Sequence, residues 1–187
     1  YVRRERLLVH VGDRFALGSA RLLALDDQTH QLVQPLTAYC GAGAQHEVDR
    51  ALESIVQGHM IILHGTRSDA VLELARTLHA HSIRKDFPFT PINAVPESEA
   101  AIEALCTQAG CGTIFLDLTQ PFEIPLGFAR NLFSERFHLW PIVVAPVAVD
   151  AFRCFGKACS EPKRIGFGVC ELGFPRTRWH WSMSDVN

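Results

Sequence analysis

The stretch that decides the fold is residues 60–81, which read MIILHGTRSDAVLELARTLHAH. Residues 60–63 are a short, fully apolar run, as expected of a strand buried on both faces of a parallel sheet. From 69 to 81 the apolar side chains recur at helical spacing, which predicts a long helix. The loop between them, 64–69, leads from the carboxyl end of a strand into a helix, where α/β proteins commonly bind ligands.

The same alternation of patterns extends on both sides of this stretch, from residue 43 to residue 150. Strands that alternate with helices favour a parallel sheet whose crossover connections cover both of its faces. The predicted class is therefore α/β, a three-layer sandwich around a parallel sheet. Its further helices are predicted over 47–57, 97–109 and 126–133, and its further strands over 89–93, 113–116 and 142–147.

The two ends of the chain carry strand patterns instead. Near the start, short apolar stretches alternate with turn signals, which predicts a small antiparallel sheet with strands at 6–11, 21–25 and 31–33. Near the end, Gly and Pro punctuate two further strand patterns, at 164–170 and 178–183. We expect a small β-rich N-terminal segment, 1–42, and an α/β domain, 43–187, with its core at 43–150 and a short C-terminal β-rich segment at 151–187.

The composition narrows the classes of function. Hydrophobic residues make up 48% and charged residues 20% of the 187 residues, and the net charge is -2. These values are ordinary for a globular domain and lack the basic field of a dedicated nucleic-acid binder, so direct DNA binding is not expected. No apolar run reaches the roughly 18 residues of a membrane helix. The opening residues, YVRRER, precede no apolar signal-peptide core, and we expect a cytoplasmic protein without a membrane partner.

Six cysteines are present, at positions 40, 106, 111, 154, 159 and 170. Their closest spacings are C-x4-C, which is looser than the C-x2-C of most structural zinc sites. We expect buried or half-buried thiols in a reducing cytosol, and predict neither a metal nor another cofactor. The alternative is a zinc site built from Cys154, Cys159, Cys170 and His180.

Two separated motifs carry a family resemblance. Residues 75–93 read ARTLHAHSIRKDFPFTPIN, and residues 110–117 read GCGTIFLD. In this order they resemble the stretch after Walker A and the Walker B strand in the AAA+ domain of bacterial enhancer-binding proteins. Those proteins are the ATPases that activate sigma-54 RNA polymerase. The resemblance covers residues 41–150 and implies a P-loop NTPase-like fold.

The residues that would bind and hydrolyse ATP in that family are replaced. The resemblance places Val71 where the Walker A lysine belongs and Leu118 where the water-orienting glutamate belongs, whereas Asp117 keeps the metal-side acid. The sensor strand ends at 145–148 without a polar residue, and 94–109 is too short for the loop that contacts the sigma factor. Since phosphoryl transfer depends on positioning and charge neutralisation, the resemblance implies a pseudo-ATPase, not an enzyme.

The candidate site is a degenerate nucleotide site around the loop 64–69. The expected function is a non-catalytic regulatory or scaffolding module in bacterial transcription or signalling control. Its partner would be a protein, either a second copy or an active AAA+ regulator. The alternative is a sensor that binds a nucleotide or cyclic dinucleotide without hydrolysis, anchored by Arg67, Arg84 and Lys85. The residues of the degenerate site are Gly65, Thr66, Arg67, Ser68, Val71 and Asp117.

Two other patterns have competing interpretations. Residues 116–121, LDLTQP, also resemble the phosphoacceptor strand end of a response-regulator receiver domain. The acidic pair and the lysine that a receiver requires are not in place, so a local hydrogen-bonding role is expected for Asp117. The tail 176–181, RTRWHW, combines cations with aromatic side chains as single-strand binders do. Without a wider basic patch, an edge strand or a partner-binding surface is predicted there.

Overall fold

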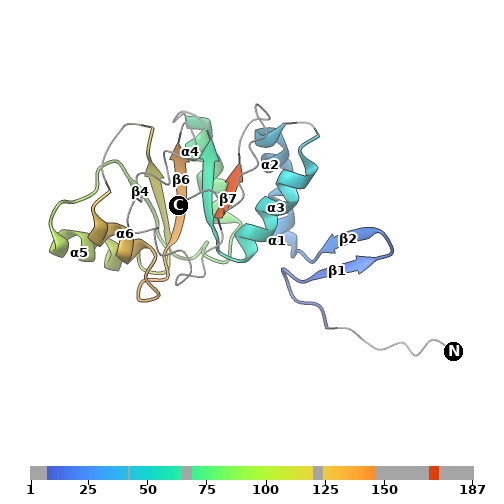
Figure 1. The fold of residues 1–187 in the computed structure, drawn as a ribbon, viewed down its shortest axis with the longest axis horizontal. Coiled ribbons are helices and arrows are strands. Elements are labelled where there is room, and N and C mark those ends of the chain that lie inside the picture. The colour runs from blue at the N-terminus through green and yellow to red at the C-terminus, as the bar shows by residue number, and fades with distance from the viewer. Residues whose placement is uncertain (1–7, 42, 65–68, 120–123, 146–168, 173–187) are drawn as a thin grey trace, which may run out of the picture.

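The computed structural model describes residues 8–41, 43–64, 69–119, 124–145 and 169–172 of the 187-residue chain. Helices and strands alternate along the central part of the chain (Figure 1). In chain order the elements are β1 (Arg14–Leu17), β2 (Ala20–Leu23), α1 (Asp27–His30), α2 (Val33–Cys40), α3 (Gln45–Val56), β3 (Met60–His64), α4 (Asp69–Ala80), β4 (Phe89–Ile92), α5 (Glu99–Ala109), β5 (Thr113–Asp117), α6 (Leu126–Leu132), β6 (Trp140–Ala145) and β7 (Val169–Leu172).

The centre of the domain is a five-stranded sheet in the order β4-β5-β6-β3-β7. Every neighbouring pair in it is parallel, so the chain must cross a face of the sheet between consecutive strands. Strands β3 and β6 are buried almost throughout, with Ile61 opposite Ile142 and Leu63 opposite Val144. The predicted α/β class, a three-layer sandwich around a parallel sheet, is confirmed.

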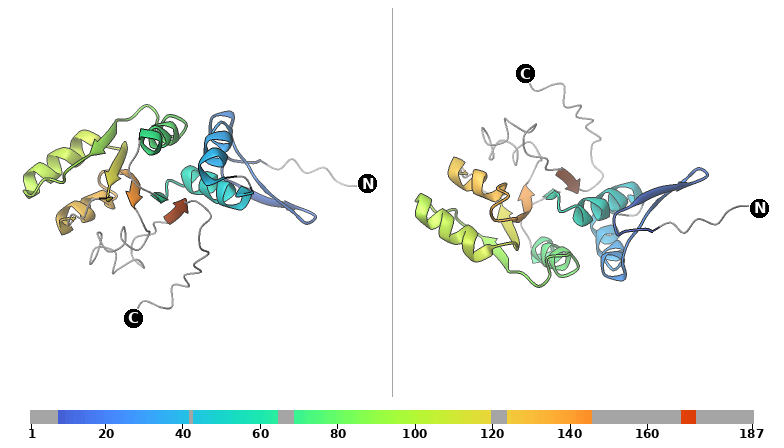
Figure 2. Two further views of the ribbon diagram at one scale, coloured as in Figure 1. Left: turned by 90° about the horizontal axis from the view of Figure 1, so that it is seen from above. Right: turned by 90° about the horizontal axis from the view of Figure 1, so that it is seen from below.

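Helices cover both faces of the sheet, as the two views in Figure 2 show. Helices α5 and α6 pack on the face to which Met60 and Ile62 belong. Helices α2, α3 and α4 pack on the other face, to which Ile61 and Leu63 belong. Because successive side chains of a strand point to opposite faces, one fully apolar strand contributes to two separate cores.

The small antiparallel sheet predicted at the N-terminus is present, but of its predicted strands only 21–25 matches an observed one, β2. Strands β1 and β2 form an antiparallel hairpin with the two-residue loop Gly18-Ser19. Gly18 adopts a φ of +62°, a conformation that such tight loops need and that glycine adopts without strain. The described part of the predicted strand 6–11 is not a strand, because the hairpin turns at Gly18 and not at Gly12.

The third predicted strand, 31–33, is wrong. Its residues lead into helix α2 and begin it. Leu32, Leu36 and Cys40 recur at intervals of four residues and are buried, which is a helical spacing. Pro35 lies in the first turn of α2, where a backbone N–H would find no acceptor within the helix, so proline is tolerated there.

The C-terminal region contributes one described strand, β7. It begins five residues after the start of the predicted strand 164–170 and pairs with β3 at the edge of the sheet. The predicted strand 178–183 lies outside the described residues. Among the helices in the described part of the chain, none combines the length and the apolar character that a membrane span requires.

A tight turn determines where β5 begins. The amide of Gly112 donates to the carbonyl of Ala109, and the amide of Thr113 donates to the carbonyl of Pro88, both over 2.9 Å. A Cβ atom on Gly112 would lie 2.6 Å from the oxygen of Ala109 and closer still to the oxygen of Pro88. Any side chain at this position would displace backbone, so this glycine is required by the close approach of two turns.

We expect Gly112→Ala to destabilise the protein, whereas Gly127→Ala should not. The first change should lower the free energy of unfolding by about 3 kcal/mol, because the clash is with backbone oxygens. A Cβ on Gly127, in α6, meets nothing within 4 Å, and its replacement should stabilise the helix by up to about 1 kcal/mol. Urea denaturation followed by circular dichroism measures both. Equal stability of the two variants would contradict the role given to Gly112.

Candidate functional site

The candidate site lies where β3, β5 and β6 end, at the carboxyl edge of the sheet. Asp117, the last residue of β5, is opposite Val144 of β6, and Val144 is opposite Leu63 of β3. Asp117 therefore lies two strand spacings, or about 10 Å, from the end of β3. By strand alternation Asp117 belongs to the same face as Phe115, which is the face covered by α4.

The end of β3 is held by a helix from the N-terminal region. The hydroxyl of Tyr39, in α2, donates to the carbonyl of His64 over 2.7 Å. Burial, with a smaller contribution from the neighbouring Cys40, raises the pKa of Tyr39 to about 12. The hydroxyl thus keeps its proton at neutral pH and remains a donor. Nothing in the sequence indicated this contact, because the two residues are 25 positions apart.

Asp117 makes local hydrogen bonds at the start of the loop that follows β5. Its Oδ1 accepts from the backbone amide of Thr119 over 3.0 Å and from the hydroxyl of Thr119 over 2.6 Å. The carboxylate is half-buried. The local hydrogen-bonding role expected for Asp117 is confirmed, and this geometry orders the first turn of the loop.

Val71 and Leu118, which the resemblance places at the Walker A lysine and the water-orienting glutamate, are both apolar and buried. Val71, in the first turn of α4, is 6% exposed and belongs to the core between α2, α3, α4 and the sheet. Leu118 is 4% exposed and belongs to the core on the opposite face, with α5 and α6. Neither side chain is available to a ligand at the carboxyl edge, because each contributes to the packing of a helix on the sheet.

The remaining loop residues of the predicted site, Gly65, Thr66, Arg67 and Ser68, lie outside the described residues. The structure describes the two residues that flank them, His64 at the end of β3 and Asp69 at the start of α4. This confirms the predicted context of the loop, between a buried strand and a long helix.

Arg84 lies at the opposite, amino edge of the sheet. Its Nη1 donates to the carbonyl of Cys111 over 2.5 Å and to the carbonyl of His138. These two acceptors have positive φ values, 55° and 49°, and they precede β5 and β6. Burial lowers the pKa of the Arg84 guanidinium, and the buried Nε has no hydrogen-bond partner. Arg84 therefore ties together the turns that lead into three neighbouring strands.

Lys85 is engaged at the same edge. Its Nζ donates to Oε1 of Gln28 over 2.9 Å. The side-chain amide of Gln28 in turn donates to the carbonyls of Ser82 (3.1 Å) and Ala80 (3.3 Å). These bonds connect α1 to the end of α4. The structure thus separates Arg84 and Lys85, two of the three ligand anchors predicted for the nucleotide-sensing alternative, from Asp117.

The motif that carries the family resemblance also gathers at the amino edge. Nδ1 of His79 is 2.9 Å from the hydroxyl of Thr113, and the ring of His79 contacts Phe89 with centroids 5.5 Å apart. Ser82 donates to the carbonyl of His79 over 2.8 Å and accepts from the amide of Arg84 over 3.1 Å. Burial lowers the pKa of His79, which favours the neutral ring. These contacts join the end of α4 to β4 and to the start of β5.

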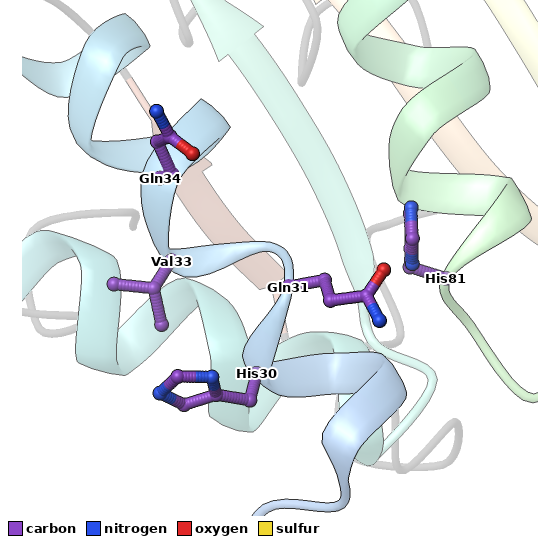
Figure 3. Close-up of a pocket in the computed structure, with 5 residues that line it drawn as sticks. All are labelled: His30, Gln31, Val33, Gln34 and His81. Atoms are coloured by element: carbon purple, nitrogen blue, oxygen red, sulfur yellow. The ribbon is translucent and has the colours of Figure 1, made fainter.

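A shallow pocket of about 470 Å³ lies beside this network (Figure 3). In the close-up the side chain of Gln31 points toward His81, whereas His30 and Val33 point away from it. The pocket is lined by His30, Gln31, Val33, Gln34 and His81.

Among the described residues no three His, Cys, Asp or Glu side chains are placed to hold a metal ion. Of the alternative zinc ligands, Cys154, Cys159 and His180 lie outside those residues.

No protein-family model matches the sequence, and no curated protein matches it. Among solved structures, the fold is similar to the P-loop NTPase domain of the sigma-54 transport activator from E. coli, with 13% identity, a TM-score of 0.44, and coverage of 68% of this chain and 93% of that chain. It is also similar to NtrX from Brucella abortus in complex with ADP, with 14% identity, a TM-score of 0.45, and coverage of 77% of this chain and 38% of that chain. The similarity is one of fold, at low identity.

We expect Val71→Lys to destabilise the protein far more than Ala70→Lys, the same change at the exposed neighbouring position. A lysine at 71 would place an ammonium group in an apolar core, which should lower the free energy of unfolding by about 3 kcal/mol. The change at Ala70 should stay within about 0.5 kcal/mol. Urea denaturation of both variants makes the comparison. If the two variants were equally stable, position 71 would face the loop as a Walker lysine does.

Arg84→Gln and Lys85→Gln should also differ. Loss of the guanidinium leaves two turn carbonyls without their charged donor, which should cost about 2 kcal/mol of stability. The exposed Lys85 should tolerate the change within about 0.5 kcal/mol. Thermal and urea denaturation provide the measurement. Should Arg84→Gln prove as stable as Lys85→Gln, the guanidinium would be free for a ligand role.

Proposed function

We propose that this chain is a pseudo-ATPase, a non-catalytic domain on a P-loop NTPase-like fold that acts as a regulatory or scaffolding protein-interaction module. The observation that carries the proposal is the burial of Val71 and Leu118 in the two cores of the domain. In the resemblance, these are the positions of the phosphate-binding lysine and the water-orienting glutamate.

The physical reason lies in how phosphoryl transfer is catalysed. The reaction depends on cations that neutralise the phosphates and on groups that position the attacking water. An apolar side chain packed against the sheet supplies neither. Asp117 is the one acid retained from the Walker B strand, and its Oδ1 is engaged by Thr119. Loss of hydrolysis therefore follows from the packing of the core as well as from the residue types.

The proposed interaction role is supported by the parts of the domain that are intact. The parallel sheet, both helical layers and the hydrogen-bonded amino edge form an intact framework around the altered carboxyl edge. A partner would be a protein, either a second copy or an active AAA+ regulator. The placement in bacterial transcription or signalling control rests on the resemblance of residues 75–93 and 110–117 to enhancer-binding proteins.

The first test is a measurement of ATP turnover by the purified protein, with Asp117→Ala as the matched variant. We expect no turnover above background in either protein, because no buried apolar side chain can replace the missing lysine and glutamate. An active sigma-54 activator domain serves as the positive control for the assay. Turnover by the unmodified chain that disappears in Asp117→Ala would refute the proposal.

The second test is a thermal-shift panel with ATP, ADP, GTP and a cyclic dinucleotide. A ligand present at 100 times its Kd stabilises the folded state by about 2.7 kcal/mol, so specific binding would be visible. We expect no shift with any of the four. A shift with one of them that is lost in Arg67→Ala would favour the nucleotide-sensing alternative over the interaction module.

A further inference from the structure

His79, in the last turn of α4, lies where three parts of the chain meet. Its ring contacts the ring of Phe89 in β4, and its Nδ1 is 2.9 Å from the hydroxyl of Thr113 at the start of β5. The backbone of Phe87, in the connection 81–88, contributes a further hydrogen bond to the ring. The residue is 9% exposed. One buried imidazole thus joins α4 to the strand that follows it and to the neighbouring strand.

The hydrogen bonds of the ring suit its neutral form. A neutral imidazole has one donor and one acceptor, whereas the charged ring donates from both nitrogens. The bond with Phe87 favours a protonated nitrogen, as a carbonyl acceptor does, so Nδ1 is the nitrogen that accepts from Thr113. Thr113 is fully buried, and within the described part of the chain its hydroxyl has no other hydrogen bond. A second proton on the ring would leave that hydroxyl without an acceptor.

The strands that His79 contacts bring no compensating charge to it. β4 contains no charged residue, and the one charged residue of β5, Asp117, lies at the opposite end of that strand. On α4 itself, the guanidinium of Arg76 lies 5.9 Å from the centroid of the Phe89 ring. A charged His79 would therefore share that ring with a second cation.

The other titratable groups around the end of α4 lie at the surface. Among the described residues no carboxylate forms an ion pair with His79. Burial is therefore the main influence on the ring, and it lowers the pKa of His79 below its ordinary value of 6.5. These surface groups are Asp27 and His30 of α1, Glu73 of α4, and His81, Lys85 and Asp86 of the connection.

We propose that His79 is an acid-sensitive latch, whose protonation releases the edge strand β4 and the connection 81–88 from α4. β4 has four residues and pairs with β5 alone, so it can open locally while the inner strands stay paired. The neutral ring is favoured in the folded state. Its contribution to stability is therefore fully present above about pH 6.5 and is lost as the pH falls below that value. The latch is independent of the proposed function.

The experiment is amide hydrogen exchange of the whole chain, followed by mass spectrometry at about pH 7.5 and about pH 5.5 and expressed as protection factors. His79→Gln keeps a hydrogen-bonding side chain that does not titrate. His81→Gln is the matched control at the surface, and His59→Gln removes the other described histidine whose pKa is lowered by burial. In the unmodified chain and both controls, we expect the acid pH to lower the protection of residues 85–94 at least about twofold. In His79→Gln the protection should be the same at both pH values.

A second measurement on the unmodified chain does not depend on how well the variants fold. In an NMR titration the ring of His79 and the amides of β4 should respond with one midpoint, below pH 6.5. Three outcomes would overturn the inference: a midpoint for His79 at or above 6.5, protection of residues 85–94 that does not change with pH, and an acid response that persists in folded His79→Gln.

Discussion

The guanidinium of Arg84 holds together the turns that precede three adjacent strands of the sheet. Arg84 itself lies in the turn that leads into β4, and its guanidinium donates to carbonyls just before β5 and β6. Parallel strands are joined by long crossovers and have no hairpin loops to align them, so their relative positions depend on contacts of this kind. The close approach of backbone at Gly112 completes the arrangement. Together they fix the amino edge of the sheet, from which the strands run to the candidate site.

The two edges of the sheet have separate roles. The amino edge contains His79, Ser82 and Arg84 in a continuous hydrogen-bonded network, and these are the residues by which the sequence resembles an ATPase family. At the carboxyl edge, where ligands bind in this class of fold, Val71 and Leu118 are buried in the two cores. A resemblance carried by framework residues therefore indicates how the chain folds and leaves the chemistry to be argued from the other edge.

The sheet and its main helices could be predicted from the sequence because their signals are local. The runs 60–63 and 113–116 are apolar at every position, as strands between two cores must be, and the helices show a clear periodicity. The first strand of the hairpin was misplaced because the chain turns both at Gly12 and at Gly18, and the sequence does not show which turn joins the two strands. Helix α2 was missed because the predicted strand 31–33 was read over too short a stretch to show the spacing of Leu32, Leu36 and Cys40. The role of Arg84 could not be found, since its acceptors lie 27 and 54 residues away. A cation in a loop looks the same in sequence whether it faces solvent, a ligand or a backbone carbonyl.

Val71 also bears on how such a domain can evolve. Once a side chain at the head of α4 has been recruited into the core, the neighbouring residues adapt their sizes to it, as close-packed interiors require. A lysine at this position would place a charge among Leu and Ile side chains, so a variant that carries one would need several compensating changes in the core. The packing therefore preserves an apolar residue at the head of α4 once it is there.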